Sequence, residues 1–197
     1  DGVINDGDNT LADHGDKVLL GNKTPRYNFG LNLDAAYKGF DLKIFFQGTL
    51  KRDYMPDPNA AGMMFWGAVG YWQTNFFEPH MDFFRPADTT SPLGPNVNAY
   101  YPRPLEDNKN RQAQDRYLQN AAYCRLKNVT LGYTLPSHLT KKFFVNNLRF
   151  FVSAENLFTI TSLCDTFDPE TIGIGSDYDG CTYPLSKTVS FGLSATF

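Results

Sequence analysis

Five stretches of the sequence alternate apolar and polar side chains with a period of two, and this pattern constrains the fold most strongly. Such alternation indicates a β-strand with one apolar face and one polar face. The expected strands are residues 26–37, 40–50, 121–135, 148–158 and 187–197. The alternation slips where Arg125 and Lys127 share a parity, so we expect a β-bulge there. The sequence therefore predicts an all-β chain of antiparallel strands.

The connections between these strands alternate sharply in length. Residues 38–39 and 136–147 are short connections, whereas residues 51–115 and 159–186 are long, and residues 1–25 have the same loop-like composition. A compact soluble domain rarely needs such long connections. Short turns at one end and long loops at the other are typical of an outer-membrane barrel, and strands of about eleven residues match a tilted span of the bilayer.

The same alternation would also fit a soluble β-sandwich, in which the apolar face packs inward. Aromatic residues make up 15% of the chain, and several lie near strand ends, where the interfacial girdles of a membrane barrel belong. Cross-strand aromatic pairs in a sandwich are the alternative explanation. The net charge of −3 and the absence of a lysine-arginine run argue against a nucleic-acid partner.

A barrel topology makes the long connections fall on one side of the membrane. If the last strand runs toward the periplasm, residues 38–39 and 136–147 are periplasmic, and the three long segments are extracellular. Five strands cannot close a membrane barrel, whose smallest members have about eight. We therefore expect the rest of the barrel to come from preceding residues or from another chain.

Several motifs together resemble the C-terminal part of SusC/RagA-type TonB-dependent transporters. They are FWGAVGYWQTNFFEPHMDFF at 65–84, NAYYPRP at 98–104, RYLQNAAYCRLKNVTLGYTLP at 116–136, LRFFVSAENLFTIT at 148–161 and YPLSKTVSFGLSATF at 183–197. The resemblance implies the last five strands of a plugged barrel of about 22 strands. The implied segments are an extracellular loop (1–25), a hairpin (26–50), a long extracellular loop (51–115), a second hairpin (116–158), a third extracellular loop (159–186) and a terminal strand (187–197).

The resemblance also implies a function and a set of partners. Members of this family import oligosaccharides, or peptides in some cases, across the outer membrane of Bacteroidetes-type Gram-negative bacteria. The expected partners are membrane lipid, the remaining barrel and plug, a SusD-like lipoprotein lid, and the TonB complex, which energises import. No cofactor is required, and no enzyme activity is expected, because His14, His80 and His138 are scattered and no catalytic motif is present.

Aromatic residues of the long loop are the candidate contacts for cargo or for a partner. Rings could stack on sugar faces, while Arg103 and Asp53 could bond hydroxyl groups. The alternative is that the aromatic residues pack the loop against itself or against the lid. The candidates are Phe65, Trp66, Tyr71, Trp72, Tyr100, Tyr101 and Arg103.

The first residues, DGVINDGD, resemble the second half of a calcium loop. Asp1 and Asp8 would supply carboxylates and Val3 a carbonyl, and members of the family often carry an NGDG-type segment here. A polar turn without an ion is the alternative.

Two smaller features remain open in the sequence. A bridge between Cys164 and Cys181 and two separate thiols are both compatible with their spacing. Phe197 resembles the terminal signal that barrel-assembly machinery recognises.

Besides the transporter, two other functions fit the pattern, namely a soluble carbohydrate-binding sandwich and an adhesin-like barrel built from several copies.

Overall fold

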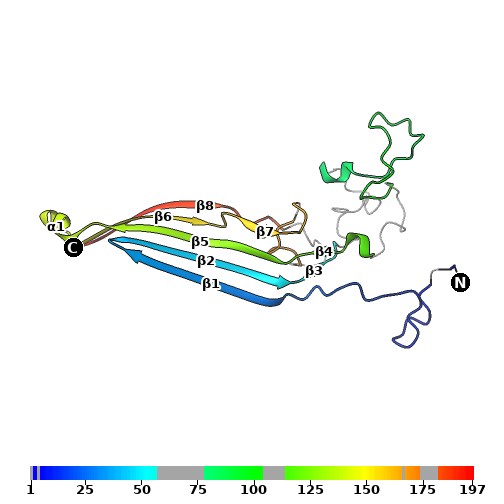
Figure 1. Ribbon diagram of the computed structural model, residues 1–197, viewed down its shortest axis with the longest axis horizontal. Coiled ribbons are helices and arrows are strands. Elements are labelled where there is room, and N and C mark those ends of the chain that lie inside the picture. Colours follow the sequence, from blue (N-terminus) through cyan, green and yellow to red (C-terminus); the bar gives the residue numbers. More distant parts are fainter. Residues whose placement is uncertain (1, 4, 57–77, 104–113, 166, 174–181) are drawn as a thin grey trace.

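A long antiparallel sheet dominates the chain (Figure 1). The computed structural model describes residues 2–3, 5–56, 78–103, 114–165, 167–173 and 182–197. The long strands of the sheet are β1 (Arg26–Tyr37), β2 (Phe40–Lys51), β5 (Tyr123–Thr134), β6 (Asn147–Glu155) and β8 (Thr188–Thr196). They are hydrogen-bonded in the order β1-β2-β5-β6-β8, so consecutive long strands are also neighbours in the sheet.

The remaining elements are short. They are β3 (Asp53–Tyr54), β4 (Gln119–Asn120), β7 (Thr159–Thr161), the helix α1 (Ser137–Thr140) and the 3-10 turns Glu78–Met81, Asp115–Tyr117 and Lys141–Phe143. The β1–β2 turn and α1 lie at one end of the sheet, and the described parts of the long connections lie at the other (Figure 1).

The strand predictions are confirmed, with one correction. The fourth strand was expected to run over residues 148–158, but β6 ends at Glu155 and β7 begins at Thr159. Asn156, between them, has a φ of +52°, which takes the backbone out of the extended conformation. Both parts still pair with β5, so they form one interrupted strand.

The predicted β-bulge lies at Lys127. On β2, Phe45 faces Asn128 and the next residue, Phe46, faces Leu126, so the register skips Lys127. The extra residue reverses the parity of β5. Arg125 and Asn128 therefore both lie on the polar face, although they are separated by an odd number of positions.

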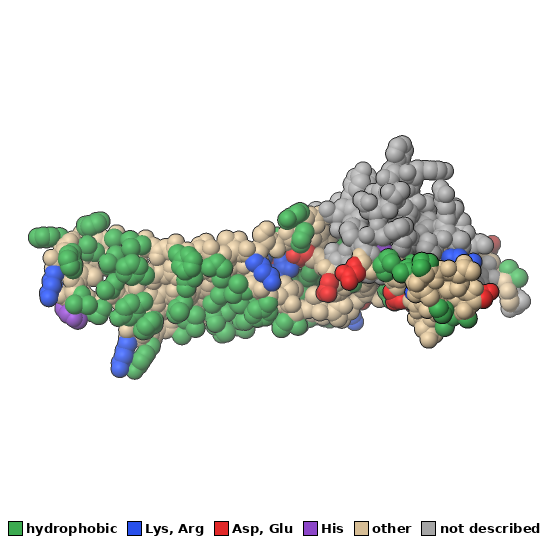
Figure 2. Space-filling view, turned by 90° about the horizontal axis from the view of Figure 1, so that it is seen from above, with side chains coloured by type: hydrophobic (Ala, Val, Ile, Leu, Met, Phe, Trp, Pro, Cys, Tyr) green, Lys and Arg blue, Asp and Glu red, His purple; other side chains and the backbone are tan. Residues whose placement is uncertain are grey.

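The apolar sides of the long strands join into one continuous face. One row of cross-strand partners is Ala35, Leu42, Leu131, Val152 and Phe191, and the next row is Leu33, Ile44, Val129, Ala154 and Val189. Leu131 is 46% exposed and Phe191 is 85% exposed, so the described residues leave this face uncovered. Figure 2 shows hydrophobic side chains gathered along the strands in one view of the molecule. In the part of the chain that is described, no helix is long and apolar enough to cross a membrane.

Tyr27 departs from the predicted alternation. It was expected to lie on the apolar face with Phe29, but its φ of +59° takes it out of the regular pleat, and the β1–β2 register passes over it. Its side chain is exposed.

The opposite face of the sheet is polar and carries an ion pair that crosses three strands. Arg149 on β6 donates through Nε and Nη2 to the Asp41 carboxylate on β2, and the Nε–Oδ1 distance is 2.9 Å. Gly132 on β5 lies beneath this contact. A Cβ on Gly132 would come within 2.3 Å of Arg149 Nη2 and within 2.5 Å of Asp41 Oδ1. A side chain at this position would therefore force the Arg149 and Asp41 side chains to shift from their present contact.

The hydrophobic core of the described residues lies among the long connections instead of beneath the sheet. Its buried members are Tyr54, Met55, Tyr101, Tyr117, Ala121, Leu163, Phe167 and Ile172. These residues come from three separate parts of the chain. The long connections consequently pack into one structure, which we call the loop core.

Candidate functional site

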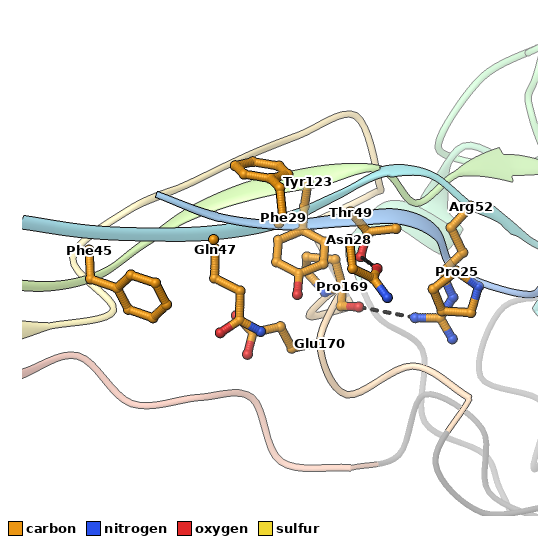
Figure 3. Close-up of a pocket in the computed structure, with 12 residues that line it drawn as sticks. Pro25, Asn28, Phe29, Phe45, Gln47, Thr49, Arg52, Tyr123, Pro169 and Glu170 are labelled. Carbon is orange, nitrogen blue, oxygen red and sulfur yellow. Dashed lines mark hydrogen bonds between the residues drawn. The ribbon is translucent and has the colours of Figure 1, made fainter. Parts of the chain in front are cut away.

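A groove of about 570 Å³ lies where β1 begins and β2 ends (Figure 3). Its volume falls within the range of roughly 300–1,000 Å³ that is typical of ligand pockets. The residues that line it are Pro25, Asn28, Phe29, Gly30, Phe45, Gln47, Gly48, Thr49, Arg52, Tyr123, Pro169 and Glu170.

The strand register explains which side chains face the groove. Phe45, Gln47 and Thr49 are alternate residues of β2 and therefore point to the same side of the sheet. In Figure 3, Phe45, Gln47 and Tyr123 point toward the side where Glu170 lies. Thr49 is buried, and its hydroxyl donates to Asn28 Oδ1 at 2.8 Å, which fixes the position of the Asn28 amide.

One wall of the groove is formed by residues 167–173, which we call the strap. The side chain of Arg52, just after β2, donates hydrogen bonds to the backbone of the strap. Its Nη1 donates to the Pro169 carbonyl at 3.3 Å, and its Nη2 donates to the Ile172 carbonyl at 3.0 Å. Its Nε donates to the Lys23 carbonyl at 3.2 Å. The guanidinium thus joins two of the long connections at the end of β2.

A buried ion-pair network fastens the strap to β5. Arg125 is only 5% exposed, and its Nη2 donates to Asp168 Oδ1 at 2.7 Å while its Nε donates to Thr159 Oγ1 at 2.6 Å. Its Nη1 lies 3.1 Å from Glu170 Oε1 as a charge contact, and Lys127 Nζ donates to Glu170 Oε2 at 3.0 Å. Pairing of this kind is necessary because an isolated charge is costly to bury.

The Asp168 carboxylate shows how the network is balanced. Burial raises its pKa, but the hydrogen bonds from Arg125 and from the Glu170 and Leu185 backbone amides outweigh burial. The net pKa of Asp168 therefore lies below the ordinary value, and the charged form is favoured.

The other side of the strap is apolar and enters the loop core. Phe167 and Ile172 are buried there, and the Phe167 ring packs edge-on against Tyr54 at a centroid distance of 5.3 Å. The strap therefore connects the loop core to the polar face of the sheet.

The structure places only some of the predicted contact residues. Phe65, Trp66, Tyr71 and Trp72 lie outside the described residues. Tyr101 is 4% exposed, and burial raises the pKa of its hydroxyl. Its ring packs against Tyr100 at 4.9 Å and against Tyr117 at 6.2 Å. This placement favours the packing alternative for Tyr101.

Arg103 and Asp53 do not meet in one site. The Arg103 guanidinium is exposed and lies 6.0 Å from the centre of the Phe84 ring. Asp53 Oδ2 instead accepts the backbone N–H of Asn22 at 2.8 Å. Their proposed roles in cargo contact stay predictions.

The calcium, disulfide and assembly hypotheses also stay predictions. Asp1 and Cys181 lie outside the described residues, and Val3 and Asp8 are exposed. Within the described ranges, no three His, Cys, Asp or Glu side chains come together as a metal site. Phe197 follows β8 and is exposed.

The most strongly connected residues of this site, Arg125, Asp168, Glu170 and Arg52, are not among the site residues predicted from the sequence. The signal that could have identified them is the break in alternation at Arg125 and Lys127. This break predicts a bulge, and it also marks two cations on one strand that carboxylates from the strap can pair with.

Comparisons with known proteins agree with this architecture. No known protein-family profile matches the chain. Two relatives from Formosa agariphila, TonB-dependent receptors P3 and P26, are 28% and 24% identical over 92% of this chain. The solved RagAB peptide transporter matches 89% of this chain at 26% identity with a TM-score of 0.63, and an open-open RagAB importer matches 88% with a TM-score of 0.61.

These likenesses are to part of a TonB-dependent receptor. The sheet has the all-β fold of the matching part of the RagA barrel, so the chain is similar to a segment of a SusC/RagA-type receptor. The chain spans 17–18% of the length of the relatives and structures that it matches.

Proposed function

We propose that this chain is a wall segment of an outer-membrane importer. The observation that carries the proposal is the uncovered apolar face of the five long strands, opposite a face that carries ion pairs. In a membrane barrel, the apolar face contacts lipid and the polar face lines the lumen. A soluble sandwich would need a second layer over the apolar face, and the described residues supply none.

The proposed orientation follows from the positions of the connections. The loop core and the groove lie at the end of the sheet that carries the long connections, which we assign to the cell exterior. The β1–β2 turn and α1 lie at the opposite end, which we assign to the periplasm. Cargo entering from outside would therefore meet the groove before it reached the Arg149–Asp41 pair.

The proposed partners are those of a complete importer. The RagAB neighbours support a surface lipoprotein of the RagB or SusD kind, which would sit over the loop core. The named relatives support TonB as the energy source. The proposed cargo is an oligosaccharide or an oligopeptide, and the proposed location is the outer membrane of a Bacteroidetes-type Gram-negative bacterium.

Uptake by intact cells tests this function. Cells that carry the full-length receptor should accumulate labelled oligopeptide or oligosaccharide, and loss of either the receptor or TonB should abolish this uptake. The receptor should also fractionate with the outer membrane and require detergent for extraction. A receptor that stays soluble without detergent would contradict the proposal and favour the sandwich.

A further inference from the structure

The charged groups that line the groove are already paired within the protein. All three nitrogens of the Arg52 guanidinium donate to backbone carbonyls. Glu170 Oε2 accepts from Lys127, and Glu170 Oε1 lies beside Arg125. These two residues are the charged members of the described lining set. A ligand that brings a charge into this groove must therefore compete with an existing contact or leave its charge unpaired.

The other polar groups of the groove are uncharged. Asn28 and Gln47 contribute primary amides, each with one acceptor oxygen and two donor hydrogens, and Tyr123 contributes a hydroxyl. A primary amide can donate to a carbonyl and accept from an N–H group, which are the two groups of a peptide bond.

The shape of the groove provides an apolar contact next to these amides. The Phe45 ring lies beside Gly30 of β1, where an added Cβ would be 3.2 Å from Phe45 Cε2. Because Gly30 has no side chain, the Phe45 ring can lie close over the β1 backbone at this position. The ring is only half-buried and belongs to the groove lining, so it is the apolar contact available to a ligand side chain.

We propose that this groove is a subsite for an uncharged peptide segment. Asn28 and Gln47 bind its peptide bonds, and Phe45 contacts an apolar side chain. A segment with an acidic or basic side chain at this position binds less well, because the groove supplies no unpaired countercharge. This inference rests on the proposed function as an importer and adds to it a cargo class and a selection against charge.

Calorimetry with the full-length receptor in detergent tests the subsite. The probes are three blocked pentapeptides that differ only at the central residue, which is leucine, aspartate or lysine. The variants are Gln47→Ala and Phe45→Ala, and the matched control is Lys43→Ala, on the same strand and the same face but outside the lining set.

The expected result is preferential binding of the leucine peptide by the unmodified receptor. Gln47→Ala and Phe45→Ala should each weaken that binding about tenfold, because a hydrogen bond or an apolar contact of this size is worth roughly one tenfold step. Lys43→Ala should leave it unchanged. Gln47→Glu should improve binding of the lysine peptide relative to the leucine peptide.

Three results would overturn the inference. They are no binding of any peptide, equal binding of the three peptides, or equal effects of the groove variants and Lys43→Ala. TonB-dependent uptake distinguishes this failure from failure of the proposed function. If uptake continues while the groove variants bind peptide normally, the proposed function as an importer is upheld and the proposed subsite is rejected.

Discussion

The buried Arg125 guanidinium should control how tightly the strap is held to the sheet. Arg125→Gln removes the contacts to Asp168 at 2.7 Å, to Glu170 at 3.1 Å and to Thr159 at 2.6 Å. Breaking a buried pair by removing one partner typically costs about 3–5 kcal/mol. We expect the lower end of that range, because Asp168 keeps two backbone N–H bonds and Glu170 keeps Lys127.

Hydrogen exchange measures this effect locally. A loss of about 3 kcal/mol corresponds to an increase of roughly 150-fold in the rate of strap opening. The amides of Glu170, Thr171 and Ile172 report it directly, because each donates to Asp168. The full-length receptor in detergent should show this acceleration in the strap and little change in β1 or β8.

Two controls make the result decisive. Arg149→Gln removes an ion pair at the distant end of the sheet and should leave the strap amides unchanged. The double variant Arg125→Gln with Asp168→Asn should exchange more slowly than Arg125→Gln alone, because no buried carboxylate is then left short of a partner. An acceleration below about threefold in Arg125→Gln would refute the view that this network holds the strap.

Three further predictions concern pH and the two faces of the sheet. Because the pKa of Asp168 is lowered, the stabilisation that its charge provides is fully present above the ordinary pKa value of 3.8. The protection of the strap amides from hydrogen exchange should therefore be the same at pH 7 and pH 5. It should be lost only as the pH falls below 3.8, and exchange measured at graded pH tests this. Gly132→Ala should displace the Arg149–Asp41 pair and lower the free energy of unfolding of the refolded receptor, measured by denaturant titration, by about 0.2–1 kcal/mol, whereas Ser190→Ala on the same face should cost little. Leu131→Arg on the apolar face should cost about 2–4 kcal/mol of stability at the bilayer midplane and should reduce the amount of the heat-modifiable folded form on gels. Thr130→Arg on the polar face should reduce that amount less. Equal loss of the folded form in the two variants would contradict the assignment of the two faces.

The strands could be predicted because their signal is local and periodic. Apolar residues at every second position identified all the long strands, and a single parity slip identified the bulge at Lys127. The break at Asn156 carried no such signal, because a positive φ at one residue does not change the alternation around it.

The site was harder to predict because its contacts are distant in the sequence. Arg125 and Asp168 are separated by 43 positions, and the strap has no periodic pattern that would align its carboxylates with β5. Tyr101 shows a related limit. Sequence identifies it as an aromatic loop residue, but only the packing of the His80, Tyr100 and Tyr117 rings around it shows that it is buried.

One face of the sheet is expected to contact lipid and the other water, and spin-label accessibility along β5 tests this most directly. Single cysteines would be placed in turn at residues 128–131 and at Tyr133 of the full-length receptor, in a background without native cysteines, and the labelled protein would be reconstituted into lipid vesicles. Labels at Val129, Leu131 and Tyr133 should be accessible to dissolved oxygen in the lipid, and labels at Asn128 and Thr130 should be accessible to a water-soluble nickel chelate instead. An alternation of period two between the two reagents is the predicted result. Equal access of the nickel chelate to both sets would contradict the account.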